Sequence, residues 1–169
     1  MAYTPHTWLT GETITADKLN NIDMALRRAA SGIQAQYLGT QAIGGTSEFI
    51  GALDSVRASQ GDGFSLGTNE ILCKYAGVVA VSAFVYCASG FTAGDQVLLA
   101  ACKNSDTIVR ASRVMAGTGQ ETIVIPTVLV TVSAGDALKI KLRNAAGARG
   151  VVGSADAAQA NGLTAHYLP

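Results

Sequence analysis

The sequence predicts a mainly β protein, in which an antiparallel sandwich follows a short N-terminal arm and one helix. From residue 52 onward, β-branched and apolar runs alternate with clusters of glycine, serine and aspartate, the pattern of short strands joined by turns. A helical period precedes these runs. We therefore divide the chain into an arm over 1–15, a helix over 16–33, a connector over 34–51 and a head domain over 52–169.

The chain of 169 residues carries little charge. Charged residues make up 14% of it and hydrophobic residues 49%, while twelve basic residues balance twelve acidic ones. A nucleic-acid partner requires a basic face, so we expect none. So few charges predict a surface that is partly hidden between subunits.

We expect no membrane partner. The longest apolar run, Ala76–Ala88, is interrupted by Ser82 and is too short to span a bilayer. Met1 leads into the arm without the pattern of a signal peptide, which predicts a protein that is made in a cytoplasm and stays soluble.

The helix has a narrow apolar seam. Its members follow one another at alternating steps of three and four residues, the spacing of a heptad repeat: Leu19, Ile22, Leu26, Ala29 and Ile33. Leucine at the first position and isoleucine at the second favour three or four strands over two. The seam therefore predicts a short trimeric coiled coil, and the alternative is a single amphipathic helix packed on its own domain.

Charges and caps fit the same helix. In the heptad frame the Lys18 ammonium of one chain can reach the Asp23 carboxylate of its neighbour, an exposed pair that biases register more than it stabilises. Thr13 or Thr15 is the expected N-cap, and Gly32 is the expected residue beyond the C-terminus.

The arm carries the candidate attachment residues Tyr3, Pro5, Trp8 and Leu9. Pro5 favours an extended start to the chain. A tryptophan on an otherwise polar arm needs a pocket, which either the helix of its own assembly or another protein can supply.

No catalytic or metal motif emerges from the chain. His6 and His166 lie far apart in the sequence, and the three cysteines have no paired spacing. We expect Cys73, Cys87 and Cys102 to be reduced and buried, and we expect a protein that is not an enzyme and has no cofactor.

Two further patterns concern the sandwich. The similar stretches Thr92–Leu98 and Ser133–Lys139 predict two turns that each launch a strand, with a calcium site as a remote alternative. Leu138–Arg143 alternates apolar and basic residues, which predicts a strand with a solvated basic outer side or a surface for a polyanion. Val97–Ala101 is apolar on both sides, as at a subunit contact.

The N-terminal residues resemble a known group of proteins. The strings Tyr3–Trp8 and Gly11–Ile22 are similar to the N-terminal signature of tailed-phage and prophage head fibres and of some tail or baseplate fibres. This resemblance implies a non-enzymatic homotrimer at the virion surface. Its N-terminus would be fixed to a capsid or tail protein, with the C-terminal domain projecting outward.

The head shows a second, weaker resemblance, through Tyr75–Ser82, the Gly-Asp loops and a closing last strand, to the trimeric jelly rolls of the tumour necrosis factor and complement-head type. It implies an antiparallel jelly-roll sandwich with Tyr75, Tyr86 and Tyr167 at the threefold interface. The chain departs from these families at Val79, where an aromatic residue is common.

The expected role of the head is adhesion to the bacterial surface or its glycans, with Phe64, Phe91 and Arg149 as ligand-facing candidates. The alternative function is a lectin-like receptor-binding module on a tail or baseplate. A weaker alternative is a polysaccharide hydrolase using Asp95 or Asp136.

Overall fold

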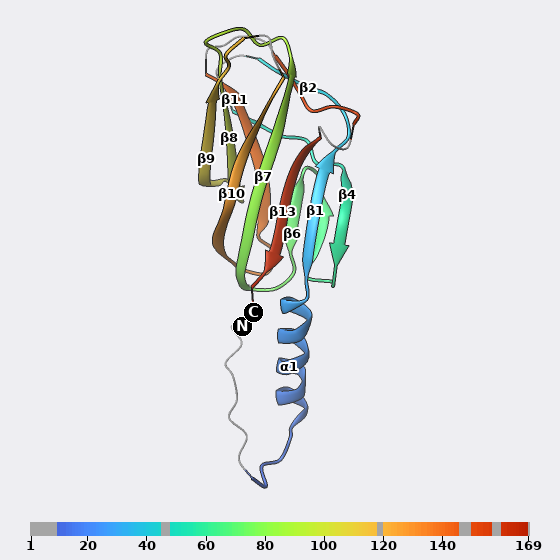
Figure 1. Cartoon of the computed structure of the whole chain (residues 1–169). Helices are drawn as coiled ribbons and strands as arrows, with labels where there is room; N and C mark the ends of the chain where they lie inside the picture. The colour runs from blue at the N-terminus through green and yellow to red at the C-terminus, as the bar shows by residue number, and fades with distance from the viewer. Residues whose placement is uncertain (1–9, 45–47, 118–119, 146–149, 157–159, 169) are drawn as a thin grey trace.

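A computed structural model describes residues 10–44, 48–117, 120–145, 150–156 and 160–168. It shows a two-layer β-sandwich with one helix projecting from the end at which the first strand begins (Figure 1). The elements run in the order α1 (Ala16–Ala29), β1 (Gly32–Tyr37), β2 (Gln41–Ile43), β3 (Phe49–Ile50), β4 (Ser55–Gln60), β5 (Phe64–Gly67), β6 (Glu70–Cys73), β7 (Gly77–Ser89), β8 (Gln96–Lys103), β9 (Asp106–Val114), β10 (Glu121–Val132), β11 (Ala137–Asn144), β12 (Gly150–Val152) and β13 (Asn161–Tyr167).

The strands form two antiparallel sheets. In the first, called sheet A here, the order is β2-β12-β7-β13-β1-β4, and β10 pairs with the other edge of β7. In the second, sheet B, the order is β5-β6-β11-β8-β9, and β3 also pairs with β11. The two layers confirm the predicted antiparallel sandwich, and the strand order fits a jelly roll.

The core lies between the two sheets and follows from alternation along the strands. In β11, Leu138, Ile140 and Leu142 are buried while the three basic residues that alternate with them are partly exposed, which confirms the predicted alternation. Ala100 on β8 is 4% exposed although it too faces outward, and its cross-strand neighbours are Lys141 and Arg110. The apolar parts of these long side chains cover it within the chain, without a second subunit.

The expected connector over 34–51 is wrong, because this segment contributes three strands. The helix ends at Ala29 and Gly32 opens β1, so Gly32 is not a helix-terminating residue and the head begins there. Ile33 is 5% exposed in the core of the sandwich, which removes it from the helical seam. Strand β1 escaped prediction because its six residues include only two large apolar side chains.

The three cysteines are free and buried, as predicted. Burial raises the pKa of Cys73 and of Cys87 to about 12, so both thiols stay protonated near neutral pH. Among the described residues no helix is long and apolar enough to cross a membrane.

The two Gly-Asp loops have the predicted role of launching strands. Gly94 and Gly135 have φ values of +93° and +90°, a left-handed conformation that suits glycine. Asp95 accepts hydrogen bonds from the backbone and hydroxyl of Thr92, at 2.8 and 3.2 Å. In the other loop Asp136 accepts from the Ser133 backbone N–H and the Asn104 side chain, at 2.8 and 2.9 Å. Each carboxylate thus closes its own turn.

The Asp136 turn gives a testable prediction about stability. The Ser133 and Asn104 hydrogen bonds lower the pKa of Asp136, so its contribution is present at neutral pH and is lost as the pH falls below about 4. We expect Asp136→Ala to reduce the free energy of unfolding by about 1–3 kcal/mol at pH 7 and by much less at pH 3. Urea unfolding at both pH values measures this. The control is Asp54→Ala, on an exposed residue, and an equal loss in both variants would contradict the prediction.

Candidate assembly surface

Helix α1 stands clear of the sandwich (Figure 1). None of its fourteen described residues is buried, and Leu19 and Leu26 are 54% and 65% exposed. Its N-cap is Thr15, whose hydroxyl accepts from the Lys18 backbone N–H at 3.4 Å. The alternative in which the seam packs on the head is therefore wrong. An amphipathic helix of this length is only marginally stable by itself in water, so contact between its exposed seam and a partner would stabilise it.

The charged residues that flank the seam, Lys18 and Asp23, have partners within their own chain. The Lys18 ammonium contacts the Glu12 carboxylate, and Asp23 accepts from Arg27 Nε at 2.7 Å, one helical turn away. The pair expected between chains, Lys18 with Asp23, stays a prediction.

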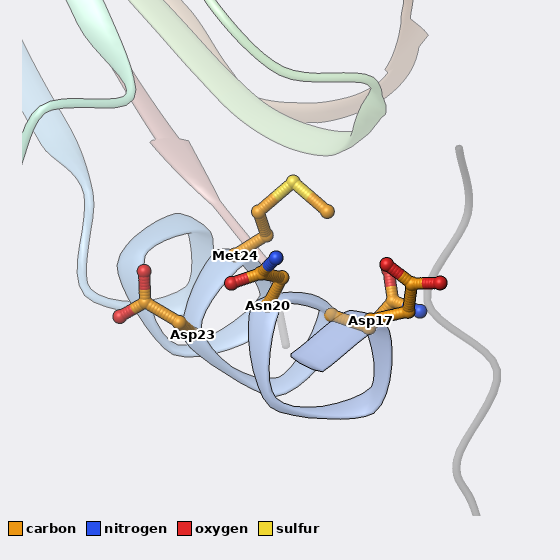
Figure 2. Close-up of a pocket in the computed structure, with 5 residues that line it drawn as sticks. Asp17, Asn20, Asp23 and Met24 are labelled. Carbon is orange, nitrogen blue, oxygen red and sulfur yellow. The ribbon is translucent and has the colours of Figure 1, made fainter. Parts of the chain in front are cut away.

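The other side of the helix is polar. An open hollow of about 660 Å³ runs along it and is lined by Asp17, Asn20, Asn21, Asp23 and Met24. Figure 2 shows Asp17 and Asp23 at opposite ends with Asn20 between them, and Met24 extending away from both carboxylates. Within the described part of the chain no group of three or more histidine, cysteine or acidic residues could hold a metal ion. The hollow lies on the polar side of the helix, opposite the seam.

The helix is fixed to the head at a junction that we call the neck, formed by Arg27, Arg28, Asp62, Tyr75 and Ala76. Arg28 Nη1 donates to the Ala76 carbonyl at 2.9 Å, and Arg27 Nη1 donates to Asp62 Oδ2 at 3.3 Å. The Tyr75 hydroxyl donates to the same carboxylate oxygen at 3.1 Å. The hydrogen bond to Asp23 is the main cause that raises the pKa of Arg27, with Asp62 adding to it.

Tyr167 joins the neck to the core. Its hydroxyl donates to the Tyr75 carbonyl at 2.6 Å and accepts from the Tyr75 N–H at 3.2 Å. Its ring stacks on Phe64 with centroids 4.6 Å apart. Ser31 makes a second link, because its hydroxyl donates to the Arg27 carbonyl and accepts from the Gly63 N–H at 2.9 Å. The C-terminal turn of the helix is thus bonded to the sandwich on two sides.

The outward side of sheet A is almost free of charge. In β1, β7, β10 and β13, all described in full, Glu121 at the first position of β10 is the sole lysine, arginine, aspartate or glutamate. The edge strand β4 adds Arg57. The outward side of sheet B instead carries the basic residues of β11 and Arg110. We call the outward side of the four strands the uncharged face.

The uncharged face differs from one side to the other. On β7 and β10 it exposes three apolar side chains, Val78, Val124 and Leu129, at 40%, 58% and 63%. Across β13 and β1, and onto the neighbouring edge strand β4, there is instead a shallow hollow of about 360 Å³. The hollow is lined by small and neutral polar residues that include Gln34, Ala58, Ser59, Gln60, Thr164 and His166. The three exposed apolar side chains, which we call the ridge, therefore lie beside the hollow on the same side of the sheet.

Two of the three tyrosines predicted at a threefold interface are buried inside the head. Tyr167 is 2% exposed and Tyr86 is 7% exposed, so neither side chain is available to a neighbour. Tyr75 is half-buried at the neck. The predicted interface role of Tyr86 and Tyr167 is therefore wrong. Large aromatic side chains are commonly buried, and these two are buried within their own head.

Phe64 and Phe91 do not face a ligand either. They are 8% and 2% exposed and belong to the core cluster. The Phe91 ring fills the space in front of Gly150, where an added Cβ would lie 2.2 Å from it. The sequence placed both residues in loops, whereas their side chains point into the core between the two sheets. Tyr3, Pro5, Trp8, Leu9 and Arg149 lie outside the described residues.

Comparisons with known proteins show the fold. No family model matches the sequence, and no curated protein matches it. Among solved structures, the chain is similar to murine APRIL at pH 5.0, with a TM-score of 0.62 and 12% identity over 82% of this chain and 99% of that one. PRD1 vertex protein P5 gives 0.61 and 17% over 83% and 99%. Eiger TNF from S. frugiperda gives 0.53 and 13% over 83% and 92%. The head is therefore a TNF-like jelly roll.

The link through Tyr167 can be tested. Tyr167→Phe keeps the ring stacked on Phe64 but removes both hydrogen bonds to Tyr75, and we expect the free energy of unfolding to fall by about 1–3 kcal/mol. Tyr37→Phe is the matched control, because the Tyr37 hydroxyl makes an exposed contact of 3.5 Å to Thr40. Chemical denaturation measures the free energy of unfolding of both variants. Similar losses would show that the buried hydrogen bonds of Tyr167 stabilise the fold no more than the exposed contact of Tyr37.

Proposed function

We propose that this protein is a homotrimeric, non-enzymatic appendage of a virus particle, fixed by its N-terminus and displaying its TNF-like head outward. The support comes from the N-terminal signature, the exposed seam of α1, the uncharged face of the head and the similarity in fold to a vertex protein. Adhesion to a bacterial surface or its glycans is the role proposed for the head.

The uncharged face carries this proposal. A solvated sheet normally alternates apolar and charged residues, as sheet B does. Sheet A instead leaves Leu129 and Val124 open to water on a face that lacks charges. Such a face is stabilised when another surface covers it. The occupant that fits is a second copy of the chain, because both the ridge and the hollow are present on every copy.

The position of the two features favours a ring. One cross-strand row of the face runs from Leu129 through Ala80, His166 and Gly32 to Gln60. The ridge is at one end of this row and the hollow at the other, so the ridge of one copy meets the hollow of the next. A contact between two different patches closes into a cyclic assembly when the rotation permits. The side chains of the helical seam favour three copies.

The stalk then follows from the neck. Each head holds its helix through Arg27 and Arg28, so three assembled heads bring three helices together. Leu19, Ile22, Leu26 and Ala29 would face the axis of the assembly. Because fourteen residues form a weak coiled coil by themselves, the heads supply most of the association energy.

Attachment is assigned to the arm through Tyr3, Pro5, Trp8 and Leu9, which would bind a capsid or tail protein. The lectin-like alternative is less favoured than the sequence suggested, because Phe64 and Phe91 are inside the core. Arg149, its third candidate, lies outside the described residues.

The trimer is tested by one surface substitution with a matched control. We expect the wild-type chain to be a trimer in analytical ultracentrifugation, and Leu129→Glu to be largely monomeric because it places a carboxylate on the ridge. Val114→Glu is the control, since Val114 is 58% exposed but belongs to sheet B. A monomeric wild-type chain, or a Leu129→Glu variant as trimeric as the control, would refute the proposed interface.

The location is tested on particles. Gold-labelled antibodies against the head should decorate intact virions of the virus that encodes this chain. A Trp8→Ala variant should fold and trimerise but be missing from them, whereas His6→Gln, a change elsewhere in the arm, should be incorporated. Unlabelled virions, or particles that incorporate Trp8→Ala normally, would contradict attachment through the arm.

A further inference from the structure

His166 is an exposed ionisable side chain on the uncharged face. It lies on β13, where its pairing partners are Ala80 on β7 and Gly32 on β1, and it lines the hollow. Gly32 leaves little room beside it, because an added Cβ there would lie 3.3 Å from His166 Cβ. The imidazole therefore belongs to the surface on which we place the neighbouring copy.

In the part of the chain that the structure describes, no carboxylate lies in the cross-strand rows around His166 on this face. Its cross-strand row contains Leu129 and Gln60 besides the two pairing partners, and the row further along β13 contains Ser82, Thr164 and Gln34. None of these titrates, and the one charged residue of the neighbouring edge strand β4 is Arg57. Among the described residues, the uncharged face therefore has no acidic group that could compensate a proton on the imidazole.

The charged groups at this end of the head include those of the neck, together with Lys74 before Tyr75 and Asp136 beside Cys73. Helix α1 brings Arg27 and Arg28 there, and Tyr167 and Leu168 follow His166 along the chain. The neck carboxylate Asp62 already accepts hydrogen bonds from Arg27 and Tyr75. The neck thus holds two arginines and one carboxylate that is already engaged in hydrogen bonds.

We propose that His166 makes the assembly sensitive to acid. Histidine is the side chain whose ordinary pKa lies closest to neutral pH. In the assembled state the ridge of the next copy covers the hollow, and an apolar surface disfavours the imidazolium form. Protonation therefore favours separated chains. The inference rests on the proposed trimer, and it names the residue that regulates its stability.

The size of the effect follows from proton linkage. A trimer that excludes the proton at three equivalent sites takes up three protons on dissociation, so stability of the assembly is lost as the pH falls below the histidine pKa. The association constant of the trimer should fall by at most about 10³-fold between pH 7.5 and pH 5.5. Carboxylates with ordinary pKa values stay ionised over this interval and contribute little.

The experiment is sedimentation of the full chain at pH 7.5 and pH 5.5, across a dilution series. The wild-type chain and His6→Gln, a change at the second of the chain's two histidines, should both dissociate at much higher concentrations at pH 5.5. His166→Gln and His166→Thr should retain the same association constant at both pH values. Circular dichroism establishes that each variant is folded.

The outcomes separate this inference from the proposed function. A wild-type chain that is monomeric at pH 7.5 overturns the trimer and the inference with it. A trimer whose association constant does not change with pH overturns the inference alone. The same result follows if the folded His166 variants respond to acid as the wild-type chain does, because another group would then be the sensor.

Discussion

The pairing of the last strand between the first and the longest strands is the constraint on which the rest depends. β13 lies between β1 and β7, and its register is continuous with β1 from Asn161 to His166 and with β7 from Gly162 to Tyr167. Sheet A therefore cannot close until the C-terminal residues are in place. The same strand carries Tyr167 to the neck and His166 to the uncharged face, so closing the sheet also builds both surfaces that we associate with assembly.

The two sheets of the sandwich have outward surfaces that differ in charge. Sheet B alternates core residues with lysine and arginine, several of which have carboxylate partners, such as Lys139 with Glu70 at 2.7 Å. Partly exposed pairs of this kind contribute modestly to folding, and they keep charged groups on that side of the sandwich. Sheet A lacks such residues over four strands. The proposed assembly uses the side of the head that lacks these charges and leaves the other side open.

The sequence predicted what short-range patterns encode. Alternation in β11 revealed its outer charges, heptad spacing revealed the seam of α1, and the Gly-Asp turns were recognisable from their residues. β1 was missed because Gly32–Tyr37 has only two large apolar side chains. Its strand conformation depends on pairing with β13 on one side and β4 on the other. The burial of Tyr86, Phe64 and Phe91 was missed because local sequence does not specify which side of a sheet a ring packs on. Long-range pairing decides these positions.

The neck has a mechanical consequence. Its links run from the backbone carbonyl of Ala76 and the carboxylate of Asp62 into the last turn of the helix, with Ser31 bonded to Gly63 on the other side. A load applied to the distal loops of the head therefore passes into the helix axis instead of bending the chain where the two meet. In a fibre built from such units, head and stalk would tilt together as a lever, and compliance would have to come from the segment that precedes the helix.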